Sequence, residues 1–274
     1  MELQGRQSNP ISITATFPAT NPVPDGETCF QLEVPQTGQY LRGHRLDTGR
    51  SPVGIFVHGF RSHCDGEKSR GLLKHAAQRN YSWICFDQRG HVESDGKFHD
   101  FTVSGAVTDL MAVIDSLAGR RAVLVGSSLG GLVSLWAASR RPSRIAGLLL
   151  LAPAVRFFER HFESLPPDAL AAWCRHDSIA FPDLYAGGHY TLGYRFFRDA
   201  AQYRLPAVLS LPCPVSILHG ERDELLPPTD SAELAGALSA PVVCSETVAG
   251  ADHRLSNAIP LLCRRLDHLW RSLD

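Results

Sequence analysis

Hydrophobic residues change their spacing along the chain at about residue 53. Residues 1–50 are rich in Thr, Pro, Gly and β-branched residues, with turn-forming groups at positions 24–26 and near Gly38. This composition predicts two or three antiparallel strands joined by turns. Beyond residue 53, short apolar runs alternate with amphipathic stretches of helical length. Such alternation is typical of strands and helices that follow one another in turn.

The alternating pattern continues almost to the carboxyl end of the chain. The predicted strands cover residues 53–58, 82–87, 121–126, 144–151, 214–219 and 241–248. The predicted helices cover residues 67–79, 103–118, 129–140, 229–238 and 256–272. Because these strands are almost wholly apolar, we expect an α/β protein with a mostly parallel sheet. We expect antiparallel amino-terminal strands to extend this sheet and helices to cover both of its faces.

One aromatic-rich stretch, residues 153–210, interrupts the alternation. Its Pro-Pro pair at 166–167 and its Gly-Gly pair at 187–188 predict short helices joined by turns. We therefore expect an inserted helical cap above the edge of the sheet. In this division residues 1–152 and 211–274 form the core, and the interrupting stretch forms the cap insertion.

Composition and charge describe an ordinary globular protein. Hydrophobic residues make up 44% of the chain, and 27 basic residues are balanced by 28 acidic ones. With this charge balance, the protein has no strong positive electrostatic potential to attract nucleic acid, so we expect no nucleic-acid partner. The longest apolar stretch, residues 145–155, is about half as long as a membrane-spanning helix, and residues 1–6 lack the layout of a signal peptide. We therefore expect no membrane span and a cytoplasmic location.

Cysteine and histidine spacing does not predict a metal or a disulfide framework. The seven cysteines are scattered and include no C-x-x-C pair, which favours reduced thiols. Cys64 is the one cysteine for which a reactive role stays open, because it follows a functional loop described below. The twelve histidines show no H-E-x-x-H or comparable ligand spacing. We expect neither a metal site nor a cofactor.

The strongest chemical signal is a G-x-S-x-G motif between a predicted strand and a predicted helix. Residues 123–131 read VLVGSSLGG and place Ser128 at the centre of the motif. A sharp strand-to-helix turn holds such a serine in a strained conformation, and side chains at Gly126 and Gly130 would collide with backbone. The turn lifts the hydroxyl above the sheet, at the positive end of the helix beginning at Leu129. This context predicts a nucleophilic serine.

A serine hydroxyl needs a general base that a third group orients. Asp223 comes shortly after the predicted strand 214–219, and His253 comes after the last predicted strand and before the final helix. Both positions follow the carboxyl end of a strand, where functional groups of parallel sheets gather. Along the chain, the nucleophile Ser128 is followed by the acid Asp223 and then by the base His253. This is the order found in proteins whose serine lies on a strand-turn-helix motif of this kind.

Three other residues compete for these two roles. Glu224 is the alternative acid, next in the chain to the favoured one. Asp252 adjoins the predicted base, but adjacent side chains in a loop usually diverge, so a turn or capping role is favoured. His219 precedes a glycine and is interpreted as a structural residue.

An oxyanion hole is the third part that this chemistry requires. It should combine the backbone N–H after the nucleophile with one from the loop after the first parallel strand. The run Ile55-Phe56-Val57-His58-Gly59-Phe60 supplies such a loop. We expect the N–H groups of Phe60 and Leu129 to hold the developing negative oxygen; taken alone, the run would be read as an ordinary strand-ending turn.

Four segments together resemble the α/β-hydrolase family, and within it the enzymes similar to the mitochondrial acyl-protein thioesterase. They are Gly126-Ser127-Ser128-Leu129-Gly130-Gly131, Phe86-Asp87 with Gly90 through Ser94-Asp95-Gly96, His219-Gly220 with Asp223, and Asp252-His253-Arg254. The resemblance covers roughly residues 53–270 and implies the α/β-hydrolase fold. It also implies hydrolysis of thioester-linked or ester-linked acyl groups by a Ser128, Asp223 and His253 triad.

The chain departs from this group at two places. Val92 stands where related sequences usually carry glycine, which puts the shape of that loop in doubt. The amino-terminal end shows no Arg-rich, Ser-rich transit peptide, so mitochondrial targeting is not carried over.

These features predict a serine hydrolase that cleaves acyl thioesters or carboxylic esters through an acyl-enzyme. The substrate is a small acyl ester or thioester, and an S-acylated protein is one candidate. A proline iminopeptidase-like amide hydrolase is the alternative enzyme, and a non-catalytic ligand-binding member of the fold is the alternative from another class.

Substrate contacts are less sharply indicated. Tyr190, Tyr194 and Phe197 recur at helical spacing in the cap. Packing of the cap onto the core is the favoured interpretation, and an acyl-chain pocket is the other. Arg61, directly after the oxyanion loop, is a candidate contact for a carboxylate or a peptide, although an exposed basic residue usually marks only solvated surface. We carry Arg61, Tyr190 and Tyr194 forward as candidate substrate contacts.

Overall fold

The computed structural model describes residues 24–163, 165–182 and 188–273. The expectations about a signal peptide, a transit peptide and any strand before residue 24 concern residues 1–23 and lie outside this part of the chain.

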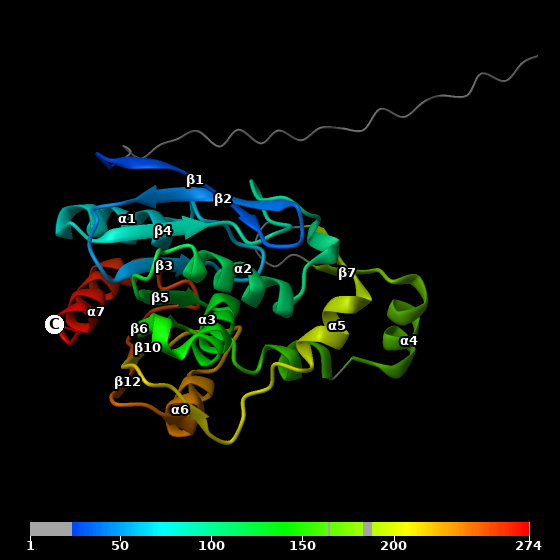
Figure 1. The fold of residues 1–274 in the computed structure, drawn as a ribbon. Helices are drawn as coiled ribbons and strands as arrows, with labels where there is room; N and C mark the ends of the chain where they lie inside the picture. Colours follow the sequence, from blue (N-terminus) through cyan, green and yellow to red (C-terminus); the bar gives the residue numbers. More distant parts are fainter. Residues whose placement is uncertain (1–23, 164, 183–187, 274) are drawn as a thin grey trace, which may run out of the picture.

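An eight-stranded sheet forms the centre of the molecule, in the order β1-β2-β4-β3-β5-β6-β10-β12 (Figure 1). Its strands are β1 Glu27–Val34, β2 Gln39–Leu46, β3 Val53–Val57, β4 Ser82–Phe86, β5 Ala122–Ser127, β6 Ile145–Leu151, β10 Val215–Gly220 and β12 Val243–Val248. The strands from β4 to β12 are paired in parallel, whereas β2 runs antiparallel to both of its neighbours. The predicted mostly parallel sheet with antiparallel amino-terminal strands is confirmed.

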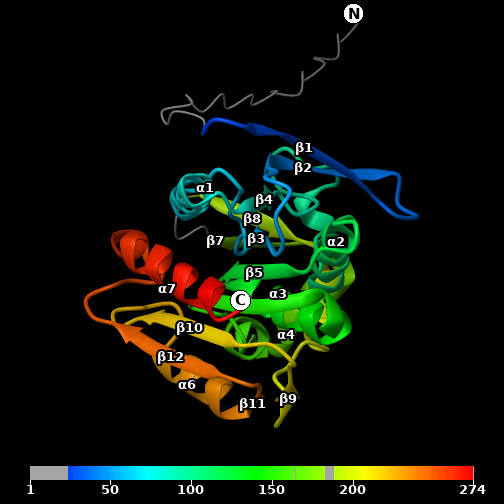
Figure 2. The same ribbon diagram turned by 60° about the vertical axis from the view of Figure 1, so that its left-hand side comes forward.

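Helices cover both faces of this sheet (Figure 2). They are α1 Glu67–Arg79, α2 Val103–Asp115, α3 Leu129–Arg140, α6 Pro228–Ala237 and α7 Ile259–Arg271. Buried side chains of α1 and α7 share one hydrophobic cluster, while those of α2, α3 and α6 belong to a second cluster on the opposite face. Single turns of 3-10 helix lie at Phe98–Asp100, Pro142–Arg144 and Ser256–Ala258.

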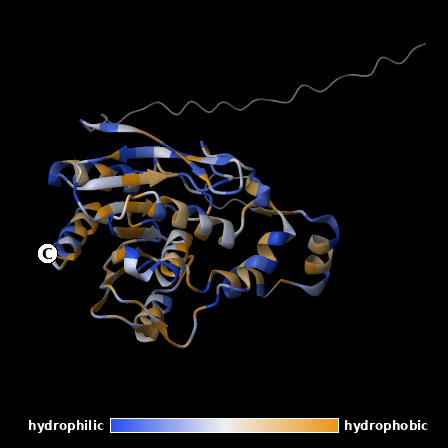
Figure 3. Ribbon diagram, viewed as in Figure 1, coloured by the Kyte–Doolittle hydropathy of each residue, from blue (hydrophilic) through white to orange (hydrophobic). Residues whose placement is uncertain are grey.

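Burial explains why the central strands are apolar at every position. Every residue of β3, β4 and β6 is buried, because helices pack against both sides of these strands. Strands β1 and β2 have more exposed positions, and β2 is drawn largely in the hydrophilic colour (Figure 3). The mixed composition of residues 24–50 and the continuous apolar runs of the later strands thus reflect the edge and the centre of one sheet.

The segment between β6 and β10 differs from the predicted all-helical cap. It contains a π-helical turn Glu159–Glu163, α4 Pro167–His176 and α5 Tyr194–Ala200, but also an antiparallel pair of strands, β7 Ile179–Pro182 and β8 His189–Leu192. A short strand β9 Leu209–Ser210 ends the segment and pairs with β11 Leu238–Ser239. Helices α4 and α5 lie at the end of the sheet toward which β4 points (Figure 1).

The aromatic spacing was misread because it crosses an element boundary. Tyr190 lies on β8, whereas Tyr194 and Phe197 lie on α5, and Gly193 separates the two elements. A helical period drawn through these positions therefore predicted one helix where a strand and a helix follow each other.

None of the helices in the described chain combines the length and the apolarity that a bilayer crossing requires.

Candidate active site

The sharp turn between β5 and α3 places Ser128 at the carboxyl edge of the sheet. Its backbone has φ 53° and ψ −119°, a conformation that non-glycine residues rarely adopt. A Cβ atom at Gly126 would lie 2.5 Å from the carbonyl oxygen of Gly130, and one at Gly130 would lie 2.1 Å from that of Val57. Both positions therefore require glycine, as the motif predicted.

Three side chains from distant segments meet at this turn. The Oγ atom of Ser128 lies 3.0 Å from Nε2 of His253, and Nδ1 of His253 lies 2.6 Å from Oδ2 of Asp223. With its proton on Nδ1, the imidazole donates to the carboxylate and accepts from the serine hydroxyl. The structure thus brings together the three residues that the sequence selected, although they are 125 and 30 positions apart in the chain.

The carboxylate of Asp223 is held from several sides. Its Oδ1 atom accepts hydrogen bonds from the backbone N–H groups of Leu225 and Leu226, at 2.9 and 2.8 Å. Burial alone would raise the pKa of Asp223, but hydrogen bonds from His219 and His253 outweigh it and hold this pKa well below its usual range. The acid therefore stays ionised and keeps a fixed orientation toward the imidazole.

His219 is more than the structural residue that the sequence indicated. Its Nε2 atom lies 3.0 Å from Oδ2 of Asp223 and 2.9 Å from the carbonyl oxygen of Leu226, while its Nδ1 atom lies 2.7 Å from Oγ of Ser231. The ring of His219 thus contacts the same carboxylate oxygen, Oδ2, that His253 contacts. Its position four residues before Asp223 on the strand-to-loop segment was the available signal.

The residues that competed for triad roles have other partners. The carboxylate of Asp252 accepts from the backbone N–H groups of Arg254 and Leu255, both at 3.0 Å, which is the turn role expected for it. Glu224 has no part in the hydrogen-bond chain that the described residues form from Ser128 to Asp223.

The loop after β3 lies directly against the serine. A Cβ atom at Gly59 would be 3.1 Å from Cβ and 3.7 Å from Oγ of Ser128. His58, fully buried, donates from Nδ1 to the carbonyl oxygen of Gly59 at 2.8 Å and accepts at Nε2 from the backbone N–H of Gln88 at 3.0 Å. Burial lowers the pKa of His58 to about 4, so the ring is neutral and can play both parts.

The side chain of Phe60 points into an aromatic cluster that joins the core to the cap. The ring centroid of Phe60 lies 5.3 to 6.0 Å from those of Phe98, Phe101, Phe157, Tyr190 and Phe196. These separations are typical of favourable tilted and edge-to-face aromatic contacts. Packing with the cap therefore fixes the residue whose backbone N–H was assigned to the oxyanion hole.

A cavity of about 440 Å³ opens above Ser128 and His253. Its apolar wall includes Phe157, Pro182, Tyr190 and Leu225. Tyr190 thus lines the cavity, and the guanidinium of Arg61 lies 4.4 Å from the centre of its ring. Tyr194 does not appear among the described lining residues; its ring packs on Trp173 and Phe197 inside the cap, so its assignment as a substrate contact is corrected to a packing role.

Lys68 also lines this cavity, and the sequence reasoning missed it. It lies in the first turn of α1, and its Nζ atom donates to Oγ of Ser127 at 2.8 Å. The residue is partly exposed, but its ammonium group lies deep among protein atoms, and this burial lowers its pKa to about 8. No motif marks a lone lysine in an amphipathic helix, so the sequence carried no signal for it.

Cys64 does not have the properties of a reactive thiol. It is buried, and a hydrogen bond with Cys85 together with burial raises the pKa of the Cys64 thiol. Cysteine nucleophiles require the opposite shift. All seven cysteines are free, as the scattered spacing predicted.

Comparison with known proteins decides the family. Residues 55–261 match the model of the alpha/beta hydrolase family. The chain belongs to this family. The resemblance seen in the sequence, the α/β-hydrolase fold and the expectation of a hydrolase are thereby confirmed.

Relatives within the alpha/beta hydrolase family include the palmitoyl-protein thioesterase ABHD10, mitochondrial, of Rattus norvegicus. It is 31% identical over 230 residues, which cover 82% of this chain and 77% of the relative. The protein of the same name from Homo sapiens is 30% identical over 82% of this chain and 75% of its own length. Five relatives of this name are described as mitochondrial, which overturns the cytoplasmic location expected from the sequence.

Solved structures show the same alpha/beta hydrolase architecture. Alpha/beta hydrolase domain-containing protein 10 from mouse superposes with a TM-score of 0.81 at 28% identity, over 90% of this chain and all of that one. Est1E from Butyrivibrio proteoclasticus, solved with ferulic acid bound, gives a TM-score of 0.72 at 21% identity, over 88% of this chain and 99% of that one. At this identity the second likeness concerns the fold alone.

Proposed function

We propose that this hydrolase cleaves acyl thioesters or carboxylic esters with Ser128 as nucleophile, His253 as general base and Asp223 as the group that orients it. The observation that carries the proposal is the continuous hydrogen-bond chain from hydroxyl to imidazole to carboxylate, at 3.0 and 2.6 Å. This arrangement supports nucleophilic catalysis, because a serine hydroxyl is activated only when a base and its orienting group are both within hydrogen-bond reach.

In the first half of the reaction, Oγ of Ser128 attacks the carbonyl carbon and Nε2 of His253 takes the hydroxyl proton. The negatively charged carboxylate of Asp223 stabilises the resulting imidazolium and holds its Nδ1 proton in place. As the tetrahedral intermediate collapses, the bond to the leaving group breaks and the imidazolium gives its proton to the departing sulfur or oxygen. The acyl group then remains on the serine as an ester.

We assign the oxyanion hole to the backbone N–H groups of Phe60 and Leu129. The first belongs to the peptide whose carbonyl, at Gly59, is held by His58, and the second opens helix α3. Gly59 lies against Ser128, and Leu129 lies at the positive end of helix α3, where negative charge is favoured. A donor of this kind is worth roughly a hundred- to a thousand-fold in rate.

In the second half, a water molecule gives its proton to the same imidazole and attacks the acyl-enzyme. The acid product leaves, and the proton returns to Oγ of Ser128. We propose that residues 1–152 and 211–274 provide this machinery, while residues 153–210 act as a cap that shapes the substrate cavity.

The substrate class follows from the cavity and from the relatives. The wall formed by Phe157, Pro182, Tyr190 and Leu225 suits an apolar acyl group. A thiolate leaves readily near neutral pH, so thioester cleavage needs less of the site than amide cleavage. Since the relatives are named palmitoyl-protein thioesterases and mitochondrial, we propose S-acylated proteins as one substrate class and mitochondria as the location.

Labelling with a fluorophosphonate probe tests the nucleophile directly. The wild-type protein and a Ser139→Ala variant, altered elsewhere on α3, should both be labelled and should hydrolyse acyl esters and thioesters. Ser128→Ala should lose labelling and most turnover. Equal turnover by Ser128→Ala would refute the assignment, and an unlabelled, inactive wild-type protein would indicate a ligand-binding member of the fold.

A substrate panel tests the bond that is cleaved. We expect acyl thioesters and matched oxygen esters of increasing chain length to be turned over faster than a prolyl amide. Preference for the amide would favour the iminopeptidase-like alternative and overturn the substrate class, while leaving the triad in place.

A further inference from the structure

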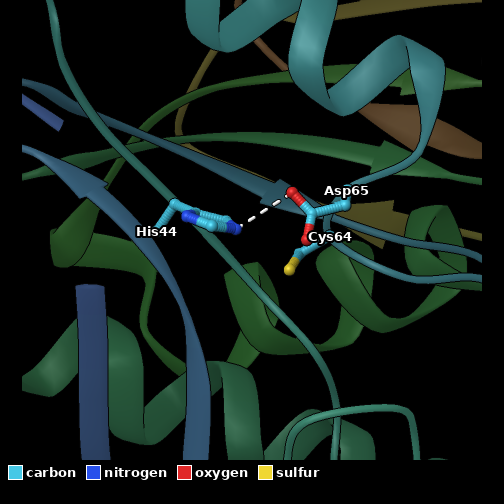
Figure 4. A group of neighbouring side chains, drawn as sticks. All are labelled: His44, Cys64 and Asp65. Atoms are coloured by element: carbon cyan, nitrogen blue, oxygen red, sulfur yellow. Dashed lines mark ion pairs between the residues drawn. The ribbon is translucent and has the colours of Figure 1, made fainter. Parts of the chain in front are cut away.

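We propose that His44, Cys64 and Asp65 form a binding site for a zinc-type divalent transition-metal ion, separate from the triad. His44 lies on β2, while Cys64 and Asp65 lie on the loop between β3 and α1, and the three side chains converge in Figure 4. Their potential ligand atoms, an imidazole nitrogen, a thiol sulfur and a carboxylate oxygen, all lie within 4.8 Å of one another. Local spacing carries no signal for this group, because the fold brings His44 on β2 next to Cys64 and Asp65 on a distant loop.

The distances are close to what a metal requires. Ligands at about 2.0 to 2.3 Å from a tetrahedral zinc ion stand about 3.5 Å apart. The Nε2 atom of His44 already lies 2.9 Å from Oδ1 of Asp65. Because the potential ligand atoms lie within 4.8 Å of one another, side-chain rotations of Cys64 and Asp65 would bring them toward this separation. The half-exposed Asp65 leaves the fourth position open to water.

A second observation, independent of this cluster, supports the site. The other ring nitrogen of His44, Nδ1, lies 2.8 Å from Oε1 of Glu27, whose side chain is 3% exposed. Arg70 holds the same carboxylate with two hydrogen bonds, at 2.6 and 3.1 Å. Metal-bound histidines commonly donate their second N–H to a buried carboxylate in this way, which fixes the ring with its free nitrogen facing the metal.

Charge and donor type narrow the choice of ion. A thiolate with an imidazole suits zinc or a similar transition metal and not magnesium or calcium, which prefer oxygen ligands. Binding would displace the proton that His44 shares with Asp65 and the thiol proton of Cys64. The charges of Cys64, Asp65 and Glu27 would then balance the divalent ion and Arg70, so no net charge is left in this partly buried place.

Such an ion would connect β2 to the loop that leads from Gly59 to α1. The backbone N–H of Cys64 already donates to Oδ1 of Asp87 at 2.7 Å, so one end of the loop is anchored. The metal would add a second anchor at the next residue, Asp65. We infer a structural site that stabilises the loop after the oxyanion donor, with no part in bond cleavage.

Metal binding by the reduced, chelator-treated full chain tests this inference. Titration with Co²⁺ should give equimolar binding and a thiolate-to-cobalt charge-transfer absorption, which Zn²⁺ then abolishes by displacement. Cys64→Ser should lose the absorption band, and Asp65→Asn, at an exposed position, should weaken binding at least tenfold. Glu27→Gln should weaken it by roughly ten- to a hundredfold through the ring of His44.

Two controls separate this site from other thiols and from catalysis. Cys263→Ser and Ser128→Ala should bind the metal as the wild-type protein does. In addition, Zn²⁺ should raise the unfolding temperature of the wild-type protein but not that of Asp65→Asn. No bound metal above background, or an unchanged absorption band in Cys64→Ser, would overturn the proposal without touching the triad.

Discussion

The buried imidazole of His58 holds the carbonyl oxygen of Gly59 at 2.8 Å, and it therefore sets the plane of the peptide that also carries the N–H of Phe60. Because the C=O and N–H of a trans peptide point in opposite directions, anchoring the carbonyl aims the N–H away from His58. An oxyanion donor is effective only when it is aimed in advance at the developing charge.

Replacement of His58 should therefore lower the rate of the chemical step more than it weakens substrate binding. For His58→Leu we expect kcat for an acyl ester to fall at least tenfold with KM changed less than threefold, since part of an oxyanion-hole effect of a hundred- to a thousand-fold is lost. Steady-state kinetics provide the measurement, and His268→Asn, an exposed histidine of α7, is the matched control. A loss confined to KM would show that His58 does not position the donor.

Lys68 should make the stability of the protein depend on pH in the alkaline range. Burial lowers its pKa from 10.5 to about 8, so between these values the unfolded chain binds more protons than the folded one. The stability of the wild-type protein gains from this residue as pH rises through that window. Lys68→Met removes the cost of the buried ammonium and should be more stable at pH 7 by roughly 1–2 kcal/mol, discounted for partial exposure.

Urea unfolding of both proteins at pH 7 and near pH 10.5 measures this difference. The advantage of Lys68→Met should shrink at the higher pH, where Lys68 is neutral in the folded protein and only about half protonated in the unfolded chain. A constant advantage at both pH values would mean that the ammonium group is not desolvated in the folded protein.

Val92 should be a site of backbone strain. Its φ is 30°, in the left-handed region that β-branched residues avoid, and the residue is 65% exposed, so little burial compensates. Glycine, the residue usual at this position in related sequences, adopts such a conformation without this strain. We expect Val92→Gly to stabilise the protein by about 1 kcal/mol in thermal or urea unfolding, with Val208→Gly, another exposed valine, as the destabilising control.

Tyr190 and Tyr194 should respond differently to truncation. Tyr190 lines the cavity, so Tyr190→Ala should shift the preference among acyl chain lengths, seen as changes in kcat/KM across the substrate panel. Tyr194 packs on Trp173 and Phe197, so Tyr194→Ala should lower the unfolding temperature while leaving that preference unchanged. The same change of preference in both variants would contradict the separation of roles.

The amino-acid sequence predicted those helices and candidate site residues whose positions depend on a local pattern. Helices α1 and α3 begin and end at the predicted residues, because amphipathic spacing and the Gly126 and Gly130 turn define them locally. The positions of Asp223 and His253 could be found because both follow strand ends, where parallel sheets gather functional groups.

The remaining features depend on contacts between distant segments. The β7–β8 pair was missed since its short strands carry no pattern longer than four residues. Lys68 and the contact of His219 with Asp223 were missed because burial and neighbours, not residue type, give them their properties. The convergence of His44 with Cys64 depends on the register of β2 against β4, which local spacing does not reveal.

Phe60 combines the backbone N–H that we propose for the oxyanion hole with a ring embedded among aromatic groups of the cap. With this assignment, acyl-chain selectivity and catalytic rate both depend on the position of Phe60. Reshaping the cap to admit a different acyl chain would disturb the electrostatic environment of the intermediate. Retargeting the enzyme to new substrates would thus require compensating changes around this ring.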